Sequence, residues 1–226
     1  MAKRPVFIPN LEKPSPLVLV KEVEFTWYAG FSIQQKRKSI AALHQSARRR
    51  GISPVLEIST KSENPFGRKL SAFNLQIRVA EDRSVPVEAA FQSSKVFKDG
   101  SQYHDLLWKS GREIKKDERL KESGALIRFE FNGKPWPLEP KTAFYDWLYL
   151  HALQQNPDLS EKLLVYRGFT DIEFNPAKSI NCQARSAALY VALNHHGLLQ
   201  EAMEEKGKFL ELLSSSSPQA KLPGMS

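Results

Sequence analysis

The chain has 226 residues, of which 41% are hydrophobic and 26% charged, a composition typical of one globular domain with a substantial core. Its 33 Lys and Arg against 25 Asp and Glu give a net charge of +8, which favours an anionic partner such as nucleic acid or a phosphorylated ligand. The single cysteine, Cys182, excludes an internal disulfide and a multi-cysteine metal site. The start of the chain lacks the apolar segment of a signal peptide and no apolar run is long enough to span a bilayer, so we expect a cytoplasmic protein without membrane contact.

In chain order, the residue pattern predicts a single α+β domain, with a small mixed β-sheet packed by several α-helices. Alternating apolar and polar residues predict a strand at 17–28, and Ser32 with Gln35 predicts a capped helix start. Further strands or extended pieces are expected at 54–59, 71–79, 125–131 and 169–174. Helices are expected at 32–51, 87–97, 103–120, 141–155, 159–167, 179–197 and 198–213.

The two ends of the chain are expected to lie outside this domain. Four prolines within residues 1–16 predict an extended N-terminal arm, because proline lacks the N–H that a regular ladder needs. A run of serines followed by proline predicts a disordered tail at 214–226. The domain itself would then cover residues 17–213.

The predicted helix at 87–97 bears the strongest chemical signal. Glu88, Gln92 and Lys95 fall at i, i+4 and i+7, so they would form one polar stripe beside the buried face of the helix. Taken alone, such a stripe is typical of an ordinary solvated helix face. The histidines show no metal-ligand spacing, and we predict no metal and no cofactor.

Two segments together resemble the signature of the NADAR family. They are Ser71-Ala72-Phe73-Asn74 and, further along, Glu88-x-x-Phe91-Gln92-x-x-Lys95. In that family a Ser-Asn-Phe loop precedes a helix reading Ser-Glu-His-Tyr-Phe-Gln-x-x-Lys. The similarity continues through 156–164, Ile172-Glu173 and 181–189, and covers roughly residues 55–195. The family's Tyr-Trp-Gly-Asp motif is replaced by residues 175–180, which puts ligand contacts from that loop in doubt.

Over its whole length the chain resembles the divergent NADAR branch of antitoxins associated with DarT-type DNA ADP-ribosyltransferase toxins. The similar segments include 27–32, 139–147 and 178–186. NADAR proteins are N-glycosidases and ADP-ribosyl glycohydrolases. The resemblance therefore implies removal of ADP-ribose from guanine bases in DNA, with a DarT-type toxin as a partner.

The resemblance also implies roles for individual residues. Glu88 would be the catalytic carboxylate, and Asp146, a charged residue among aromatics, is our candidate for a second acid. An exposed position on a half-buried helix explains Asp146 equally well. The candidates for binding the phosphates, riboses and bases of the substrate are cationic, polar or aromatic: Lys61, Asn64, Ser71, Phe73, Phe91, Gln92, Lys95, Trp147, Lys178, Asn181 and Arg185.

Three other functions remain open. An N-glycosidase acting on riboflavin-pathway intermediates would share the helix but would need no basic surface. A non-catalytic nucleic-acid-binding protein would explain the net charge of +8 and leave Glu88 without a role. An antitoxin that sequesters its toxin physically would survive the loss of Glu88.

Overall fold

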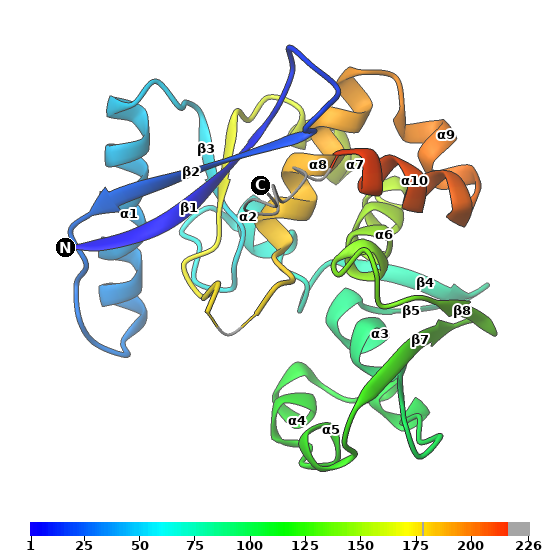
Figure 1. The fold of residues 1–226 in the computed structure, drawn as a ribbon. Coiled ribbons are helices and arrows are strands. Elements are labelled where there is room, and N and C mark those ends of the chain that lie inside the picture. Colours follow the sequence, from blue (N-terminus) through cyan, green and yellow to red (C-terminus); the bar gives the residue numbers. More distant parts are fainter. Residues whose placement is uncertain (178, 217–226) are drawn as a thin grey trace, which may run out of the picture.

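The computed structural model describes residues 1–177 and 179–216 (Figure 1). They form a single domain of mixed helix and strand content, as predicted. The strands are divided among three small sheets, of which only the largest is mixed.

The largest sheet has the strand order β2-β1-β9-β3. Strand β1 runs antiparallel to both β2 and β9, whereas β9 and β3 are parallel and end at the same edge of the sheet. The bounds of the strands are Ala2–Pro9 for β1, Val18–Phe25 for β2, Val55–Glu57 for β3 and Gly168–Thr170 for β9.

The prediction of an N-terminal arm is wrong for residues 2–9, because these residues form β1 in the middle of this sheet. Val6 and Phe7 are buried, on opposite faces of the strand, and each belongs to a different apolar cluster. The ladder between β1 and β9 consists of the single pair Phe7–Phe169, so the prolines at 5 and 9 interrupt no pair on that side.

The two faces of the sheet are covered by different helices. Helix α1, Ile33–Arg49, packs on one face through a cluster that includes Ile40 and Leu43. Helix α8, Gln183–His195, packs on the other face against β1 and β9 (Figure 1). Behind α8 lies α6, Ala143–Gln154, and both helices are buried along nearly their whole length.

Two smaller antiparallel sheets complete the strand structure. Their strands are β4 Gln76–Ala80 with β5 Arg83–Pro86, and β6 Lys95–Phe97 with β7 Leu126–Phe131 and β8 Lys134–Trp136. The strand predicted at 71–79 begins only at Gln76, because residues 71–74 form a turn in which Ser71 O accepts from the N–H groups of Asn74 and Leu75, each at 2.7 Å.

The remaining helices are short and lie between or after these elements. The helix predicted at 103–120 is broken into three pieces, and α2 lies in a segment with no predicted helix. Their bounds are α2 Pro65–Lys69, η1 His104–Trp108, α4 Gly111–Lys116, α5 Arg119–Glu122, α7 Pro157–Leu163, α9 Leu199–Glu204 and α10 Lys206–Ser216. Residues 214–216 of the predicted tail therefore belong to α10, and residues 217–226 lie outside the described part of the chain.

The central helix, α3, ends earlier than the sequence predicts. It covers Val87–Ser93, and Lys95 is the first residue of β6. The hydroxyls of Ser93 and Ser94 both donate to Ala90 O, at 3.1 and 2.6 Å, and so occupy a carbonyl near the end of the helix. Ser94 O then accepts from Glu130 N at 2.7 Å, which starts the pairing with β7. Lys95 therefore does not continue the helical stripe of Glu88 and Gln92.

Candidate functional site

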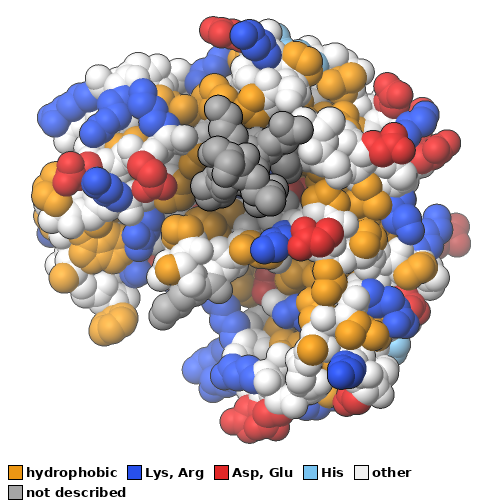
Figure 2. All heavy atoms as spheres, in the orientation of Figure 1, with side chains coloured by type: hydrophobic (Ala, Val, Ile, Leu, Met, Phe, Trp, Pro, Cys, Tyr) orange, Lys and Arg blue, Asp and Glu red, His pale blue; other side chains and the backbone are white. Residues whose placement is uncertain are grey.

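A cleft of about 350 Å³ contains Glu88, the residue with the strongest sequence signal. Figure 2 shows a hollow between the part of the molecule around α1 and the part around α4, with Lys and Arg side chains along it. The lining residues come from the loop before β4, from α3, α4 and α6, from the segment between β9 and α8, and from the first residue of α8: Ala72, Phe73, Glu88, Lys115, Tyr145, Asp171, Glu173, Phe174, Asn175, Ser179, Asn181 and Gln183.

Glu88 is held in the first turn of α3 by the loop that precedes β4. Its N–H donates to Ala72 O at 2.9 Å, and the N–H of Val87 donates to Leu75 O at the same distance. One turn later, Gln92 Nε2 donates to Glu88 Oε1 at 2.9 Å. The backbone and the carboxylate of Glu88 are thus both fixed, whereas Gln92 does not itself line the cleft.

Lys95 lies near Glu88 although it is on a strand. Its Nζ is 5.4 Å from the centre of the Phe91 ring. Burial lowers the pKa of Lys95, and the negative charge of Glu88 acts in the opposite direction. The structure therefore brings Glu88, Gln92 and Lys95 together, through tertiary packing rather than through one helix face.

Phe73 and Lys115 form one wall of the cleft. Lys115 Nζ is 4.5 Å from the centre of the Phe73 ring. On the same helix, Gly111 lies so close to that ring that an added Cβ would approach Phe73 Cδ1 to 2.4 Å. The ring of Phe73 and the ammonium of Lys115 therefore lie side by side in the cleft. Position 111 requires glycine, because a larger residue would clash with the Phe73 ring.

The opposite wall belongs to the segment between β9 and α8. Asn181 lines the cleft, and its Oδ1 is buried without a hydrogen-bond partner. Gln92 Oε1, beside Glu88, is buried and unpartnered as well. Because an unpaired buried acceptor is costly, the Asn181 oxygen favours a ligand that brings hydroxyl or N–H donors, whereas Gln92 does not line the cleft. The predicted site residue Lys178 lies outside the described residues.

Tyr145 closes the inner end of the cleft, and Phe91 lies behind it. The Tyr145 and Phe91 rings are perpendicular, with centres 5.2 Å apart. Burial, followed by the charge of Glu88, raises the pKa of Tyr145 well above its ordinary value. Phe91 also packs on Phe129 and Phe144 and does not line the cleft. Phe91 is therefore a core residue, in contrast to its predicted role in binding.

Gln183 connects the two walls. Its Oε1 accepts from Ala72 N at 2.7 Å, and its Nε2 donates to Ile58 O at 2.7 Å and to Asp171 Oδ2 at 2.9 Å. Ala72 O in turn accepts from Glu88 N. Three hydrogen bonds in series, through Ala72 and Gln183, therefore fix Asp171 relative to the backbone of Glu88.

Asp171 and Glu57 form a pair of carboxyl groups at the ends of the parallel strands β9 and β3. Glu57 is fully enclosed and accepts from Ser59 Oγ, Thr170 Oγ1 and Ile172 N. Burial raises the pKa of Glu57. Burial and the nearby Glu57 raise the pKa of Asp171 to about 8. Asp171 is the member of the pair that reaches the cleft.

The second acid suggested by the sequence, Asp146, is not in the cleft. It is 1% exposed, and it forms an ion pair with Arg185 and accepts a 2.6 Å hydrogen bond from Ser186 Oγ. Arg185 also donates to Thr142 Oγ1 at 3.2 Å. Asp146 and Arg185 were both predicted to act on the substrate. They form an ion pair with each other instead, and this pair joins α6 to α8.

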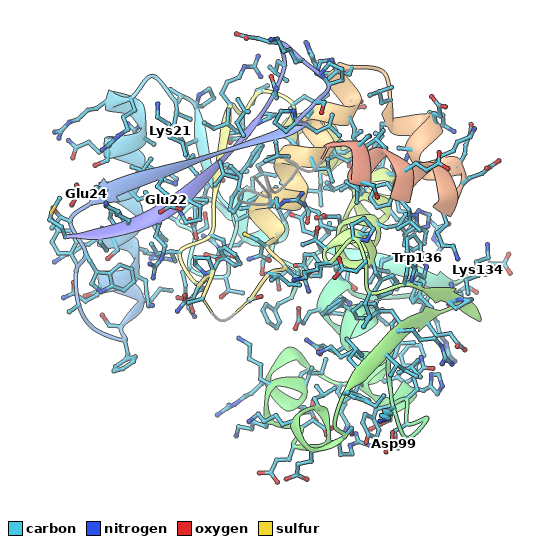
Figure 3. The ribbon with its side chains drawn as sticks, in the orientation of Figure 1. Lys21, Glu22, Glu24, Asp99, Lys134 and Trp136 are labelled. Atoms are coloured by element: carbon cyan, nitrogen blue, oxygen red, sulfur yellow. The ribbon has the colours of Figure 1, made fainter. Side chains whose placement is uncertain are left out.

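Trp147 lies in a different cavity, of about 450 Å³, that shares no lining residue with the cleft. Its ring is stacked on His151, with centres 4.8 Å apart, and lies 4.9 Å from Trp136. Figure 3 shows Trp136 and Lys134 on β8, well separated from the segment between β9 and α8. The helical period of α6 places Trp147 on the side away from Tyr145.

The other three predicted binding residues have structural contacts near the cleft and do not line it. Asn64 Oδ1 caps α2 by accepting from Phe66 N at 2.9 Å. Ser71 is fully buried in the turn before β4. Lys61 follows β3, and its backbone N–H donates to Ser59 Oγ.

Several residues of the cleft were not found from the sequence. Lys115 lies in a segment predicted only to be helical, Asp171 showed no motif, and Gln183 lies in the similar segment 178–186 but was given no role. The sequence contains one signal that could have indicated Asp171. This carboxylate directly follows a short buried strand, and the loops after strands commonly carry functional groups. Among the described residues, no three His, Cys, Asp or Glu side chains come together as a metal site.

The chain is similar to a known protein family over nearly its whole length. A family model described as DarT1-associated NADAR antitoxin matches residues 2–222. The chain belongs to the DarT1-associated NADAR antitoxin family. The match includes β1, in agreement with its central place in the sheet.

No curated protein matches the chain. In the part of the chain that the structure describes, every helix is too short or too polar to cross a membrane.

Proposed function

We propose that this protein is an ADP-ribosyl glycohydrolase that removes ADP-ribose from guanine bases in DNA and so acts as an antitoxin to a DarT1-type toxin in the cytoplasm. One observation carries the proposal: the carboxylate of Glu88, oriented by Gln92, lies in a cleft beside the unpaired acceptor of Asn181 in a chain of this family.

The lining of the cleft suits the parts of an ADP-ribosyl group. Phe73 offers a face for a purine, and Lys115 offers a cation for the pyrophosphate. The unpaired Oδ1 of Asn181 can accept from a ribose hydroxyl. Each class of group in the ligand thus has a matching side chain.

Glu88 supplies the charge that the reaction needs. Cleavage of an N-glycosidic bond gives the anomeric carbon oxocarbenium character, which a nearby carboxylate stabilises. The same carboxylate can take a proton from the attacking water. Because Gln92 Nε2 already holds Oε1, the other oxygen, Oε2, is left for water or the sugar.

The mouth of the cleft is suited to a polyanion. Helix α4 bears three exposed cations, Arg112, Lys115 and Lys116, on one side. On the other side, Lys36 of α1 is paired with the cleft residue Glu173 at 3.1 Å, so its charge is offset. A DNA strand whose modified base enters the cleft would therefore pass positive charge along α4.

The test is a direct comparison of substrates. We expect the purified protein to release ADP-ribose from single-stranded DNA modified on guanine and to leave thymine-modified DNA intact, with the products followed by mass spectrometry. A riboflavin-pathway intermediate is included as a third substrate. Turnover of this small molecule alone would replace the proposal by an N-glycosidase function, and turnover of none of the three would favour a binding function.

A further inference from the structure

We propose that Asp171 is the general acid that protonates the departing guanine nitrogen. This inference rests on the proposed glycohydrolase function. The cleavage leaves the bonding electron pair on a guanine nitrogen, which departs poorly as an anion, so a proton donor is needed opposite the carboxylate that activates water.

The position of Asp171 relative to Glu88 is fixed by the hydrogen bonds described above. Gln183 Nε2 donates to Asp171 Oδ2, and the Glu173 N–H donates to Asp171 Oδ1, each at 2.9 Å. Both carboxyl groups line the same cleft, Glu88 from α3 and Asp171 from the segment after β9. Tyr145 lies close enough to both for their charges to raise its pKa, with Glu88 the larger contributor. The two acids therefore face a common space.

The surroundings of Asp171 favour its protonated form. The titratable groups facing it are Glu57 from β3, Glu173 from its own segment, Tyr145 and Tyr149 from α6, and Cys182. The cations on this side of the molecule include Lys36 of α1, which is paired with Glu173, and Lys115 of α4, which lines the same cleft. Beyond Glu57, His44 of α1 contacts Thr170, and burial lowers the pKa of His44 to about 4, so this ring is neutral near pH 7.

The carboxyl group can hold a proton without losing its contacts. Each oxygen of Asp171 accepts one N–H and has a second lone pair free. Burial and Glu57 both raise its pKa and so favour the protonated form that the reaction requires.

The step balances as follows. The oxygen of water forms a bond to the anomeric carbon, and Glu88 takes one proton from this water. The carbon–nitrogen bond breaks, its electron pair moves to the guanine nitrogen, and the proton of Asp171 goes to that nitrogen. Return of the proton from Glu88 to Asp171 through solvent restores both groups. The products are ADP-ribose and unmodified guanine.

The experiment compares two leaving groups. Asp171→Asn keeps an oxygen that can accept from Gln183 or Glu173 but cannot act as an acid. We expect it to lower the rate on guanine-modified DNA by about 100-fold or more. The second substrate is ADP-ribose with a 4-nitrophenoxy group on the anomeric carbon. We expect the rate on this substrate to change by less than about 5-fold, because 4-nitrophenolate departs without a proton.

The wild-type pH profile provides an independent measurement. The rate on guanine-modified DNA should fall as the pH rises through about 8, where Asp171 loses its proton. The rate on the nitrophenyl substrate should lack this fall, and Asp171→Asn should abolish the difference between the two profiles.

Other outcomes separate the two proposals. Equal losses on both substrates, or no loss on either, would overturn the role of Asp171 while leaving the glycohydrolase function intact. Glu88→Gln serves as the reference, because it should lose activity on both substrates. Wild-type protein inactive on both substrates would overturn the proposed function and the role of Asp171 with it.

Discussion

Gln92 donates a 2.9 Å hydrogen bond to the carboxylate of Glu88, one turn away on α3. The amide nitrogen of Gln92 is therefore occupied, while its Oε1 remains buried and unpaired beside the cleft. This arrangement orients Glu88. It depends on the (i, i+4) spacing of a helix, which is why the pair can be recognised in the sequence.

Glu88→Gln tests the central carboxylate. The substitution keeps the shape of the side chain and an oxygen that can accept from Gln92, but removes the charge. We expect glycohydrolase activity on guanine-modified DNA to fall by at least about 100-fold, or ~3 kcal/mol, the scale of one electrostatic contact in a transition state. Thermal unfolding should be unchanged. A variant that releases ADP-ribose at nearly the wild-type rate would show that another group performs the reaction.

Lys95→Met tests whether the amine beside Glu88 contacts the ligand. We expect ADP-ribose binding, measured by calorimetry, to weaken about tenfold, which corresponds to the loss of one hydrogen bond to a charged group. Because burial lowers the pKa of Lys95, its charged form is costly in the folded state, so the free energy of unfolding should not fall by more than about 0.5 kcal/mol. Lys98→Met, at an exposed position on the same segment, is the control. Unchanged affinity together with a large loss of stability would assign Lys95 a structural role.

Gly111→Ala tests the contact that positions Phe73. The added Cβ would approach Phe73 Cδ1 to 2.4 Å, so the ring or the start of α4 has to move. We expect a loss of stability of about 1–3 kcal/mol, as for overpacking, and weaker binding of ADP-ribose. Gly207→Ala is a matched control, because a Cβ there meets nothing within 4 Å. Normal binding by the Gly111 variant would show that Phe73 does not contact the ligand.

Asp146→Asn separates structure from catalysis at the residue first considered as a second acid. The change breaks the ion pair with Arg185 inside the α6–α8 contact. We expect the free energy of unfolding to fall by about 2 kcal/mol, and kcat per folded molecule to stay within about threefold of the wild type. Asp158→Asn, at an exposed position in the first turn of α7, should change neither. A large loss of kcat without a loss of stability would return Asp146 to the list of catalytic residues.

Salt should reveal whether the basic mouth of the cleft is used for DNA. Contacts between cations and phosphates release counterions, so the rate on modified DNA at limiting substrate should fall steeply as salt rises from about 50 to 200 mM. The rate on an ADP-ribosylated free guanine nucleotide should fall much less. Lys116→Gln on α4 should reduce the slope for DNA by about one unit if this lysine contacts a phosphate. Equal slopes for the two substrates would show that the charge serves another purpose.

The sequence by itself determined the features that depend on local spacing. Alternation in β2, the capped start and apolar face of α1, and the long buried helices α6 and α8 are encoded within single segments. Glu88 and Gln92 could be paired for the same reason. The end of α3 could not be predicted, because it depends on β7, which is distant in the sequence. Glu130 N of β7 donates to Ser94 O, and Lys95 pairs with Phe129 as the first residue of a strand.

Only the tertiary structure decided which charged groups face the cleft. Asp146 is isolated from it by Arg185, whereas Asp171 is placed in it by Gln183, which also bonds Ala72 N from 111 residues away along the chain. Lys115 reaches the cleft because α4 packs on Phe73 through Gly111. These contacts join segments that are remote in sequence, and the burial that shifts a pKa exists only once those segments are packed together.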